Sequence, residues 1–218
     1  IGIQYGVLLA VMSWGMYKTV NATYWQYFMT NVAMVPTALV GGVMLFASIA
    51  DIVTVPVAGI MMEKIRLPWG KYTSWLVAGP PIVVVFFILC FIAWPFGDVA
   101  AVVCFGAAYA LASIGINTMI TANNMAINLG ASNPTDRAVL ATKKGQGSAV
   151  AGLVFGVIGL PIITFFNELG GGSGQDGTMG YIAIIIILGL VMMGCFYFLF
   201  VNVNKKLAYD ASQGVDKQ

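Results

Sequence analysis

The chain has 218 residues, of which 60% are hydrophobic and 8% are charged, and its formal net charge is +2 at pH 7. A soluble globular domain carries about 25% charged residues, so this composition argues against a water-soluble enzyme or a nucleic-acid-binding domain. The mean hydropathy of +0.91 instead predicts an integral membrane protein, whose partner is the lipid bilayer. Histidine is absent, which excludes an imidazole as metal ligand, general base or proton relay.

Six apolar segments, each bounded by Gly, Pro, Asn or charged residues, are predicted to cross the membrane. Each is longer than the roughly 18 residues that span about 30 Å of hydrocarbon as a helix. Because the segments lack the alternating pattern of barrel strands, and because a backbone in lipid must satisfy its own hydrogen bonds, helices are predicted. The fold class is therefore an all-α membrane bundle of six transmembrane helices over residues 1–204, with 205–218 as a cytoplasmic tail or interdomain loop. The predicted spans are residues 3–29, 36–62, 72–95, 99–129, 138–166 and 179–203.

The positions of the Lys and Arg residues predict the orientation of the chain. The loops after the first, third and fifth spans contain Asp98, Glu168 and Asp176 but no Lys or Arg. The positive-inside rule therefore places both termini in the cytoplasm, in a plasma (inner) membrane protein. The glycine-rich stretch 170–174 then becomes a flexible exterior loop. Nine of the ten cations lie on the predicted cytoplasmic side, namely Lys64, Arg66, Lys71, Arg137, Lys143, Lys144, Lys205, Lys206 and Lys217.

Lys18 and Asp51 are charged residues near the middle of the first and second predicted spans. A charge at the bilayer centre costs about 2.5–3.5 kcal/mol even on insertion scales, so such residues usually face a cavity or a partner. One interpretation is a static ion pair that locks the two helices together. The other is that one or both residues line a hydrated pathway, where they contact a cation, a proton or a substrate.

The first span carries Trp14, Lys18, Asn21 and Trp25 on one helical face, at offsets of 0, 4, 7 and 11. Aromatic rings beside polar groups suit a carbohydrate, because a ring covers the apolar sugar face while amides and charges bind the hydroxyls. Aromatic residues in spans also serve as packing or interface anchors, and both interpretations stay open. Lys18 and Trp25 are candidate substrate-binding residues.

The fourth span carries a polar stripe, Ser113, Asn117, Thr121, Asn124 and Asn128, at steps of three or four residues. Amides that faced lipid would lack hydrogen-bond partners, so the stripe must face protein or water. It serves either hydrogen bonding between helices or a substrate pathway. For the second interpretation, Asn117, Thr121 and Asn124 are candidate substrate-binding residues.

The sequence lacks the residue combinations that are typical of a hydrolytic active site. The sequence has no His, no pair of intramembrane carboxylates and no Gly-x-Ser-x-Gly motif. Its three cysteines lie in apolar runs without Cys-x-x-Cys spacing, so disulfides and thiolate metal sites are not expected. We expect a protein that is not an enzyme and that has no cofactor, apart from H⁺ or Na⁺ as a coupling ion.

Three segments resemble the glycoside–pentoside–hexuronide:cation symporters, the melibiose-permease branch of the major facilitator superfamily. They are Asp51–Gly59, Arg66–Tyr72 and Asn133–Arg137. The resemblance implies an alternating-access carrier that binds substrate and coupling ion near the midplane, between two six-helix halves. This chain corresponds to the first half, and the same gene or a second chain would supply the other. The expected cytoplasmic gate consists of Arg66, Trp69, Lys71 and Arg137.

The sequence also departs from that family at positions that matter for coupling and for sugar binding. Sodium-coupled relatives carry two Asp residues one turn apart, whereas here Asp51 is followed by Val55. A single carboxylate favours proton coupling, although Lys18 as a tethered cation would make transport uncoupled. A sugar-binding acid and a sugar-contacting Trp of the family fall on Ile120 and Asn124. A neutral or acidic solute held by Lys18 and the amides is therefore expected, rather than a galactoside.

The sequence thus predicts a secondary active transporter, or half of one. It would move a small polar organic solute, a sugar or glycoside, by alternating access, with Asp51 as the residue for cation or proton coupling. The alternative is a non-transporting membrane subunit that assembles with a partner complex. For that alternative, Lys18 and Asp51 would be structural.

Overall fold

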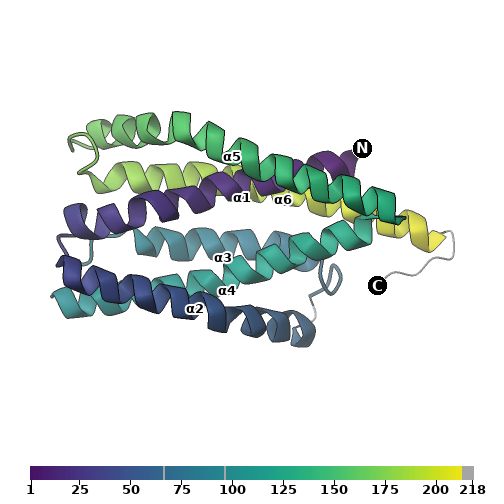
Figure 1. Cartoon of the computed structure of the whole chain (residues 1–218), viewed down its shortest axis with the longest axis horizontal. Helices are drawn as coiled ribbons and strands as arrows, with labels where there is room; N and C mark the ends of the chain where they lie inside the picture. The colour runs from purple at the N-terminus through teal and green to yellow at the C-terminus, as the bar shows by residue number, and fades with distance from the viewer. Residues whose placement is uncertain (66, 96, 213–218) are drawn as a thin grey trace.

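The computed structural model describes residues 1–65, 67–95 and 97–212 and shows an all-α protein (Figure 1). Within those ranges the chain forms six α-helices and one short π-helix, and no strand. This confirms the predicted all-α fold class. The elements are α1 (Gly2–Tyr27), the π-helix η1 (Phe28–Val32), α2 (Thr37–Lys64), α3 (Ser74–Cys90), α4 (Asp98–Gly130), α5 (Pro134–Leu169) and α6 (Thr178–Ser212).

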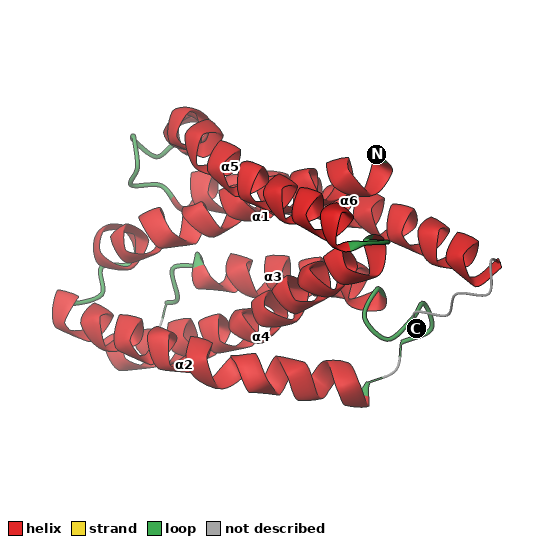
Figure 2. Ribbon diagram, turned by 45° about the vertical axis from the view of Figure 1, so that its right-hand side comes forward, coloured by secondary structure: helices red, strands yellow, loops and turns green. Residues whose placement is uncertain are grey.

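The helices lie in two groups of three, α1 with α5 and α6, and α2 with α3 and α4 (Figures 1 and 2). Contacts between α3 and α6 join the two groups. The start of α1 and the end of α6 lie at the same end of the bundle (Figure 1). This is the arrangement expected for an even number of antiparallel spans.

α5 begins at Pro134, four residues before the predicted start of the fifth span at residue 138. The side chain of Asn133 accepts a hydrogen bond from the backbone nitrogen of Asp136 at 2.7 Å and caps the helix. Proline in the first turn and an acidic residue near the helix N-terminus both favour a helix start. The polar loop segment before the apolar run is therefore helical.

α6 continues to Ser212, beyond its predicted end at residue 203. Lys206 and Asp210 form an ion pair of 3.4 Å one helical turn apart, a spacing that stabilises helices. Residues 205–212 thus extend the helix and are not a loop.

Length and hydropathy alone make four of the described helices, α2, α4, α5 and α6, able to cross a membrane. α3 is apolar but has 17 residues, because it ends at Cys90 and not at the predicted residue 95. α1 has 26 residues, but polar side chains such as Lys18, Asn21 and Gln26 interrupt its apolar sequence.

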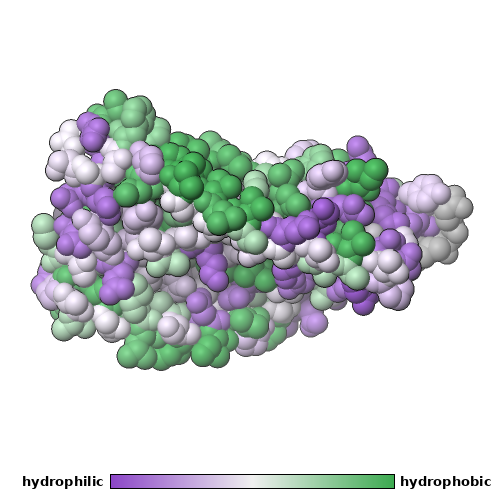
Figure 3. All heavy atoms as spheres, turned by 45° about the horizontal axis from the view of Figure 1, so that its top comes forward, coloured by the Kyte–Doolittle hydropathy of each residue, from purple (hydrophilic) through white to green (hydrophobic). Residues whose placement is uncertain are grey.

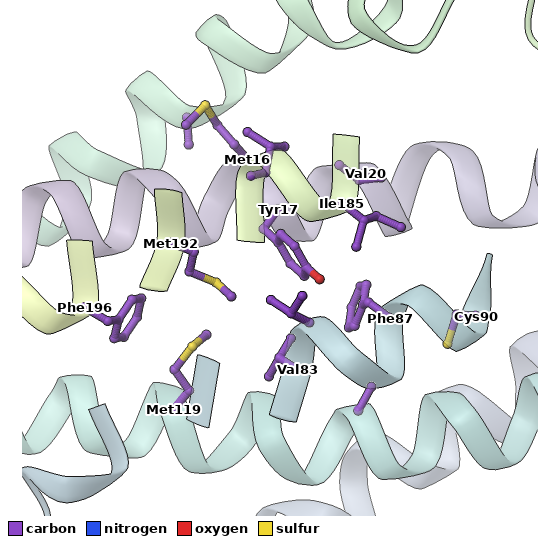
Figure 4. Packing of buried hydrophobic residues seen from close by; sticks show 14 of the residues in the cluster. Met16, Tyr17, Val20, Val83, Phe87, Cys90, Met119, Ile185, Met192 and Phe196 are labelled. Atoms are coloured by element: carbon purple, nitrogen blue, oxygen red, sulfur yellow. The ribbon is translucent and has the colours of Figure 1, made fainter. Parts of the chain in front are cut away.

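A hydrophobic core fills the space between the two helix groups. In Figure 4, side chains from α1, α3, α4 and α6 point toward one another, among them Tyr17, Phe87, Met119 and Ile185. The rings of Tyr17 and Phe87 lie 5.1 Å apart between centroids. These contacts between helices from both groups hold the bundle together.

The outer surface is hydrophobic over large areas (Figure 3). On α2, Leu45, Ile49 and Ile52 are all more than half exposed, and on α5 so are Leu153 and Val157. Exposed apolar areas of this kind are covered in the cell by lipid or by another protein. The surface agrees with an integral membrane protein.

α1 and α5 approach each other closely at Gly147. A Cβ atom at this position would lie 2.5 Å from the carbonyl oxygen of Leu8, so only glycine fits. Farther along α5, Gly152 and Gly156 have no atom within 4 Å of the equivalent position. Small residues at a helix–helix contact permit such close approach; on the α1 side of this contact, a Cβ atom at Gly15 would lie 2.6 Å from the Cβ atom of Ala151.

The loop between α5 and α6 is held by Asn167, which is fully buried. Its Nδ2 donates to the carbonyl oxygen of Gly174 at 3.0 Å, and its Oδ1 accepts from the backbone nitrogen of Gly180 at 2.6 Å. At the far side of the loop, Tyr27 donates to Asp176 at 3.0 Å. The glycine-rich loop is therefore tied to α5, α6 and α1, whereas the sequence predicted a flexible linker.

Candidate functional site

A cavity of about 470 Å³ opens between α1, α2 and α4, with one residue of α3 in its wall. Its volume is in the range of small-molecule sites. Most of the wall is apolar, and the polar groups come from three helices. The polar and aromatic lining residues are Trp14, Lys18, Asn21 and Trp25 of α1, Ser48 and Asp51 of α2, Phe87 of α3, and Tyr109 and Asn117 of α4.

Asp51 is half-buried in the wall of this cavity and is bound by two hydroxyl groups of α4. Tyr109 donates to its Oδ2 at 3.0 Å, and Ser113 donates to its Oδ1. Each carboxylate oxygen therefore accepts a hydrogen bond from the neighbouring helix.

The hydrogen bonds continue from Asp51 along the contact between α2 and α4. The hydroxyls of Thr54 and Ser113 lie 2.8 Å apart, and Asn117 donates to the hydroxyl of Thr54 at 2.9 Å. The hydroxyl of Thr54 also lies 2.8 Å from the carbonyl oxygen of Ala50 in its own helix, and Asn117 donates to the hydroxyl of Ser113 at 3.4 Å. The side chains of Asn117, Thr54 and Ser113 thus form a continuous hydrogen-bonded network that ends at the carboxylate of Asp51.

Lys18 is exposed to the cavity from α1. In the part of the chain that the structure describes, the only ion pair joins Lys206 and Asp210. Lys18 and Asp51 thus line the same cavity without forming the static pair that was one interpretation of the sequence.

Trp25 is 2% exposed and belongs to both the core and the cavity wall. Its indole nitrogen donates to the carbonyl oxygen of Cys90 at 3.2 Å, and its ring stacks on Tyr109 at 4.8 Å between centroids and 15° between planes. The N–H group of Trp25 is therefore not free for a solute, and its buried ring supports Tyr109 in the cavity wall.

Two of the predicted solute contacts, Thr121 and Asn124, lie outside this cavity wall. Thr121 donates to the carbonyl oxygen of Asn117 at 2.8 Å, within its own helix. The Oδ1 of Asn124 accepts from Lys144 of α5 at 2.7 Å. The three other predicted contacts, Lys18, Trp25 and Asn117, line the cavity together with Asp51.

Sequence reasoning missed Tyr109 as a member of the site. Tyr109 stands four residues before Ser113 and continues the polar stripe of α4 by one turn, so the spacing was a usable signal. In the sequence it looked like an ordinary part of an apolar run, because its hydroxyl acquires a role only when α2 and α4 pack together.

Trp69, a predicted gate residue, lies in the turn before α3. Its backbone nitrogen donates to the hydroxyl of Ser74 at 3.1 Å, and Thr73 donates to its carbonyl oxygen at 2.6 Å. The indole is 57% exposed and contacts the edge of Phe200 on α6 at 6.3 Å between ring centroids. The turn thus holds Trp69 against the helix that ends at the same face of the bundle.

Two other predicted gate residues, Lys71 and Arg137, lie in the turn before α3 and in the first turn of α5. The ammonium of Lys71 lies 5.1 Å from the ring centroid of its neighbour Tyr72. Arg137 is exposed in the first turn of α5. Arg66 lies outside the described residues.

Comparison with known proteins places these features in a family. Residues 6–217 match the family described as MFS/sugar transport protein. The chain belongs to this family. It is 28% identical over 191 residues to the isoprimeverose transporter of Lactiplantibacillus pentosus, an alignment that covers 85% of this chain and 38% of that protein. It is 25% identical over 179 residues to the inner membrane symporter YicJ of Escherichia coli (strain K12), covering 80% of this chain and 37% of that protein.

A further relative is an uncharacterized symporter of Synechocystis sp., 34% identical over 56 residues, which are 26% of this chain and 10% of that protein. The family match confirms the resemblance that the sequence motifs indicated and identifies a member of a transporter family, not of an enzyme family. The chain spans less than two-fifths of the length of the first two relatives.

Proposed function

We propose that this chain is one six-helix half of a secondary active carrier that moves a small polar organic solute, a sugar or glycoside, by alternating access. The observation that carries the proposal is Asp51, an intramembrane carboxylate that opens into a cavity of small-molecule size. Intramembrane acids in such positions mark ion and proton pathways. The family match and the two transporter relatives support the same function.

The lining of the cavity suits a sugar. Trp14 supplies aromatic surface for the apolar face of a pyranose ring, and Asn21 and Asn117 supply amide groups for its hydroxyls. Lys18 adds three charged hydrogen-bond donors. In this proposal the solute lies against α1 and α4, with Asp51 on the adjoining wall.

Asp51 is proposed to bind the coupling ion, either H⁺ or Na⁺. Among the described residues, no three acidic, Cys or His side chains lie close enough together to hold a metal ion. The coupling ion would therefore contact one carboxylate and neutral oxygens. The hydroxyls of Thr54, Ser113 and Tyr109 are the oxygens within the network. Tyr109 and Ser113 donate to the carboxylate, and their hydroxyl hydrogens would have to turn away to hold Na⁺, whereas a proton needs one acceptor; this favours H⁺.

The proposed carrier is completed by a second six-helix half, from the same gene or from a second chain. Exposed apolar residues of α2 such as Ile52 and Val55 border the open cavity, where such a half would close it. The cation-rich loops and the name of the Escherichia coli relative support a plasma (inner) membrane location with cytoplasmic termini. Arg66, Trp69, Lys71 and Arg137 would contribute to the cytoplasmic gate.

Uptake by the complete carrier in proteoliposomes tests the proposal. A panel of labelled sugars and glycosides is offered under an inward H⁺ or Na⁺ gradient, for the wild type, Asp51→Asn and Asp98→Asn. Asp51→Asn is expected to lose accumulation against a gradient while it retains exchange of solute across the membrane. Asp98→Asn is the matched control, since Asp98 is an exposed residue at the start of α4.

Two results would contradict the proposal in different ways. If Asp51→Asn accumulates solute with unchanged pH and Na⁺ dependence, Asp51 is not the coupling residue. If the wild type takes up no member of the panel, the non-transporting membrane subunit becomes the better interpretation.

A further inference from the structure

Two buried polar groups, one on α3 and one on α4, have no hydrogen-bond partner in the described part of the chain. Trp75, the second residue of α3, is 4% exposed, and Asn123 of α4 is 5% exposed. The atoms without a partner are the indole nitrogen of Trp75 and the Oδ1 atom of Asn123. An unpaired buried donor or acceptor costs free energy, and such groups in proteins are mostly paired with protein or with ordered water.

α3 and α4 pack against each other as antiparallel helices with a regular register. A Cβ atom at Gly115 of α4 would lie 3.0 Å from Cγ2 of Val83 on α3. A Cβ atom at Gly79 of α3 would lie 3.2 Å from the Cβ atom of Met119 on α4. Four residues forward along α4 therefore correspond to four residues back along α3, and these positions lie on the facing sides of the two helices.

The same register places Trp75 opposite Asn123. Trp75 precedes Gly79 by four residues and continues the contacting face of α3 by about one turn. Asn123 follows Met119 by four residues and continues the contacting face of α4 in the same way. An indole N–H only donates and an amide oxygen only accepts, so the two groups are complementary. They are not bonded to each other directly.

We infer that one water molecule binds between Trp75 and Asn123, where it accepts a hydrogen bond from the indole nitrogen and donates one to Oδ1. A bridging water is nearly as favourable in enthalpy as a direct hydrogen bond, and buried waters typically bind polar groups that lack a protein partner. Both side chains keep a small exposed fraction, which gives the water a path to this site. The inference involves neither the solute nor the coupling ion and is independent of the proposed function.

The water links the start of α3, and the turn before it, to α4. Trp75 directly follows Ser74, whose hydroxyl accepts from the backbone nitrogen of Trp69 at 3.1 Å and donates to the carbonyl oxygen of Gly70 at 2.8 Å. The bridge extends these hydrogen bonds from the turn to the neighbouring helix. Trp69, a predicted gate residue, is then positioned by α4 as well as by its own turn.

A double-mutant cycle tests whether the two side chains are linked. Trp75→Phe removes the donor, and Asn123→Leu removes the acceptor with little change in volume. In the full-length protein purified in detergent, Asn123→Leu is expected to lower the Tm by about 2 °C, because it leaves the indole nitrogen without its bridge. The Tm loss caused by Trp75→Phe is expected to be about 2 °C smaller in Asn123→Leu than in the wild type.

Asn128→Leu is the matched control, because it makes the same replacement at an exposed position of the same helix. It is expected to leave the Tm loss of Trp75→Phe unchanged. A cryo-EM map of the full-length wild type, at a resolution that shows ordered water, is the second measurement and needs no variant to fold. We expect density for one water molecule within hydrogen-bonding distance of both the indole nitrogen of Trp75 and Oδ1 of Asn123.

Two results would overturn the inference. If the Tm changes of Trp75→Phe and Asn123→Leu are additive and the map shows no density between the side chains, the two groups are buried without a link. In that case Asn123→Leu should raise the Tm, since it removes an unpaired polar group. If the map shows a direct hydrogen bond between Trp75 and Asn123, the coupling needs no water. Neither result depends on transport, so the proposed function is tested separately.

Discussion

Tyr109 holds Asp51 from one side of the cavity, with a hydrogen bond of 3.0 Å to its Oδ2. The same tyrosine ring stacks on Trp25, which lines the cavity from α1. One side chain therefore touches both the proposed coupling residue and the aromatic wall of the proposed solute site. Few other contacts in the molecule join α1 to α4.

Replacing Tyr109 by Phe is expected to change cation dependence more than folding. The ring and its stacking on Trp25 remain, while Oδ2 of Asp51 loses its donor. A hydroxyl that donates to a carboxylate competes with a cation for the same oxygen, so half-maximal uptake should need about tenfold less coupling cation. The measurement is solute uptake against H⁺ and Na⁺ concentration. Tyr197→Phe, at an exposed position of α6, serves as control, and an unchanged cation requirement in Tyr109→Phe would refute the competition.

The buried tyrosines Tyr17 and Tyr181 are expected to respond oppositely to loss of their hydroxyls. Both side chains are fully buried; the hydroxyl of Tyr17 has no hydrogen-bond partner among the described residues, whereas that of Tyr181 donates to the carbonyl oxygen of Gln175 at 2.9 Å. An unsatisfied buried hydroxyl is unfavourable, and a satisfied one contributes about 1 kcal/mol. In detergent, Tyr17→Phe should keep or raise the Tm, and Tyr181→Phe should lower it. Equal losses in the two variants would argue against this difference in bonding.

Gly147→Ala is expected to destabilise the contact between α1 and α5. The added methyl group would meet the backbone of Leu8, which has no flexible atoms to move aside. Overpacking of this kind costs about 1–3 kcal/mol, which lowers the Tm of a chain of this size by at least about 2 °C. Gly152→Ala on the same helix meets nothing and should be neutral or stabilising, since alanine favours helices. A similar Tm loss in both variants would show that helix propensity, and not the contact, decides.

Most of the site could be predicted because placing a polar or charged side chain in lipid costs free energy, so such residues in a span usually face a cavity or a partner. Lys18, Asp51 and Asn117 stand out in an apolar sequence, and the structure brings all three to one cavity. Asn124 obeys the same spacing on α4, yet this helix is 33 residues long and carries Asn124 past the cavity to Lys144 of α5. A helical period specifies a face but not the depth at which that face meets its neighbours.

The helix ends were less predictable because they depend on local bonds and not on hydropathy. The cap by Asn133 and the ion pair between Lys206 and Asp210 extend α5 and α6 through polar sequence. Conversely, the apolar residues after Cys90 do not continue α3. Tyr109 was missed for a related reason, since an aromatic residue in a span is read first as packing.

The division of the bundle into two helix groups has a mechanical consequence. The hydrogen bonds from Asn117 to Asp51 lie wholly within the group of α2, α3 and α4, whereas Lys18 belongs to the group of α1, α5 and α6. A sliding of one group along the other would change the distance between ammonium and carboxylate without breaking a single bond of the carboxylate. Trp25 joins the two groups, because its indole nitrogen donates to the carbonyl oxygen of Cys90 at the end of α3 and its ring stacks on Tyr109 of α4; such a sliding would have to break that hydrogen bond. The distance between the ammonium of Lys18 and the carboxylate of Asp51 therefore depends on how the two helix groups are placed relative to each other.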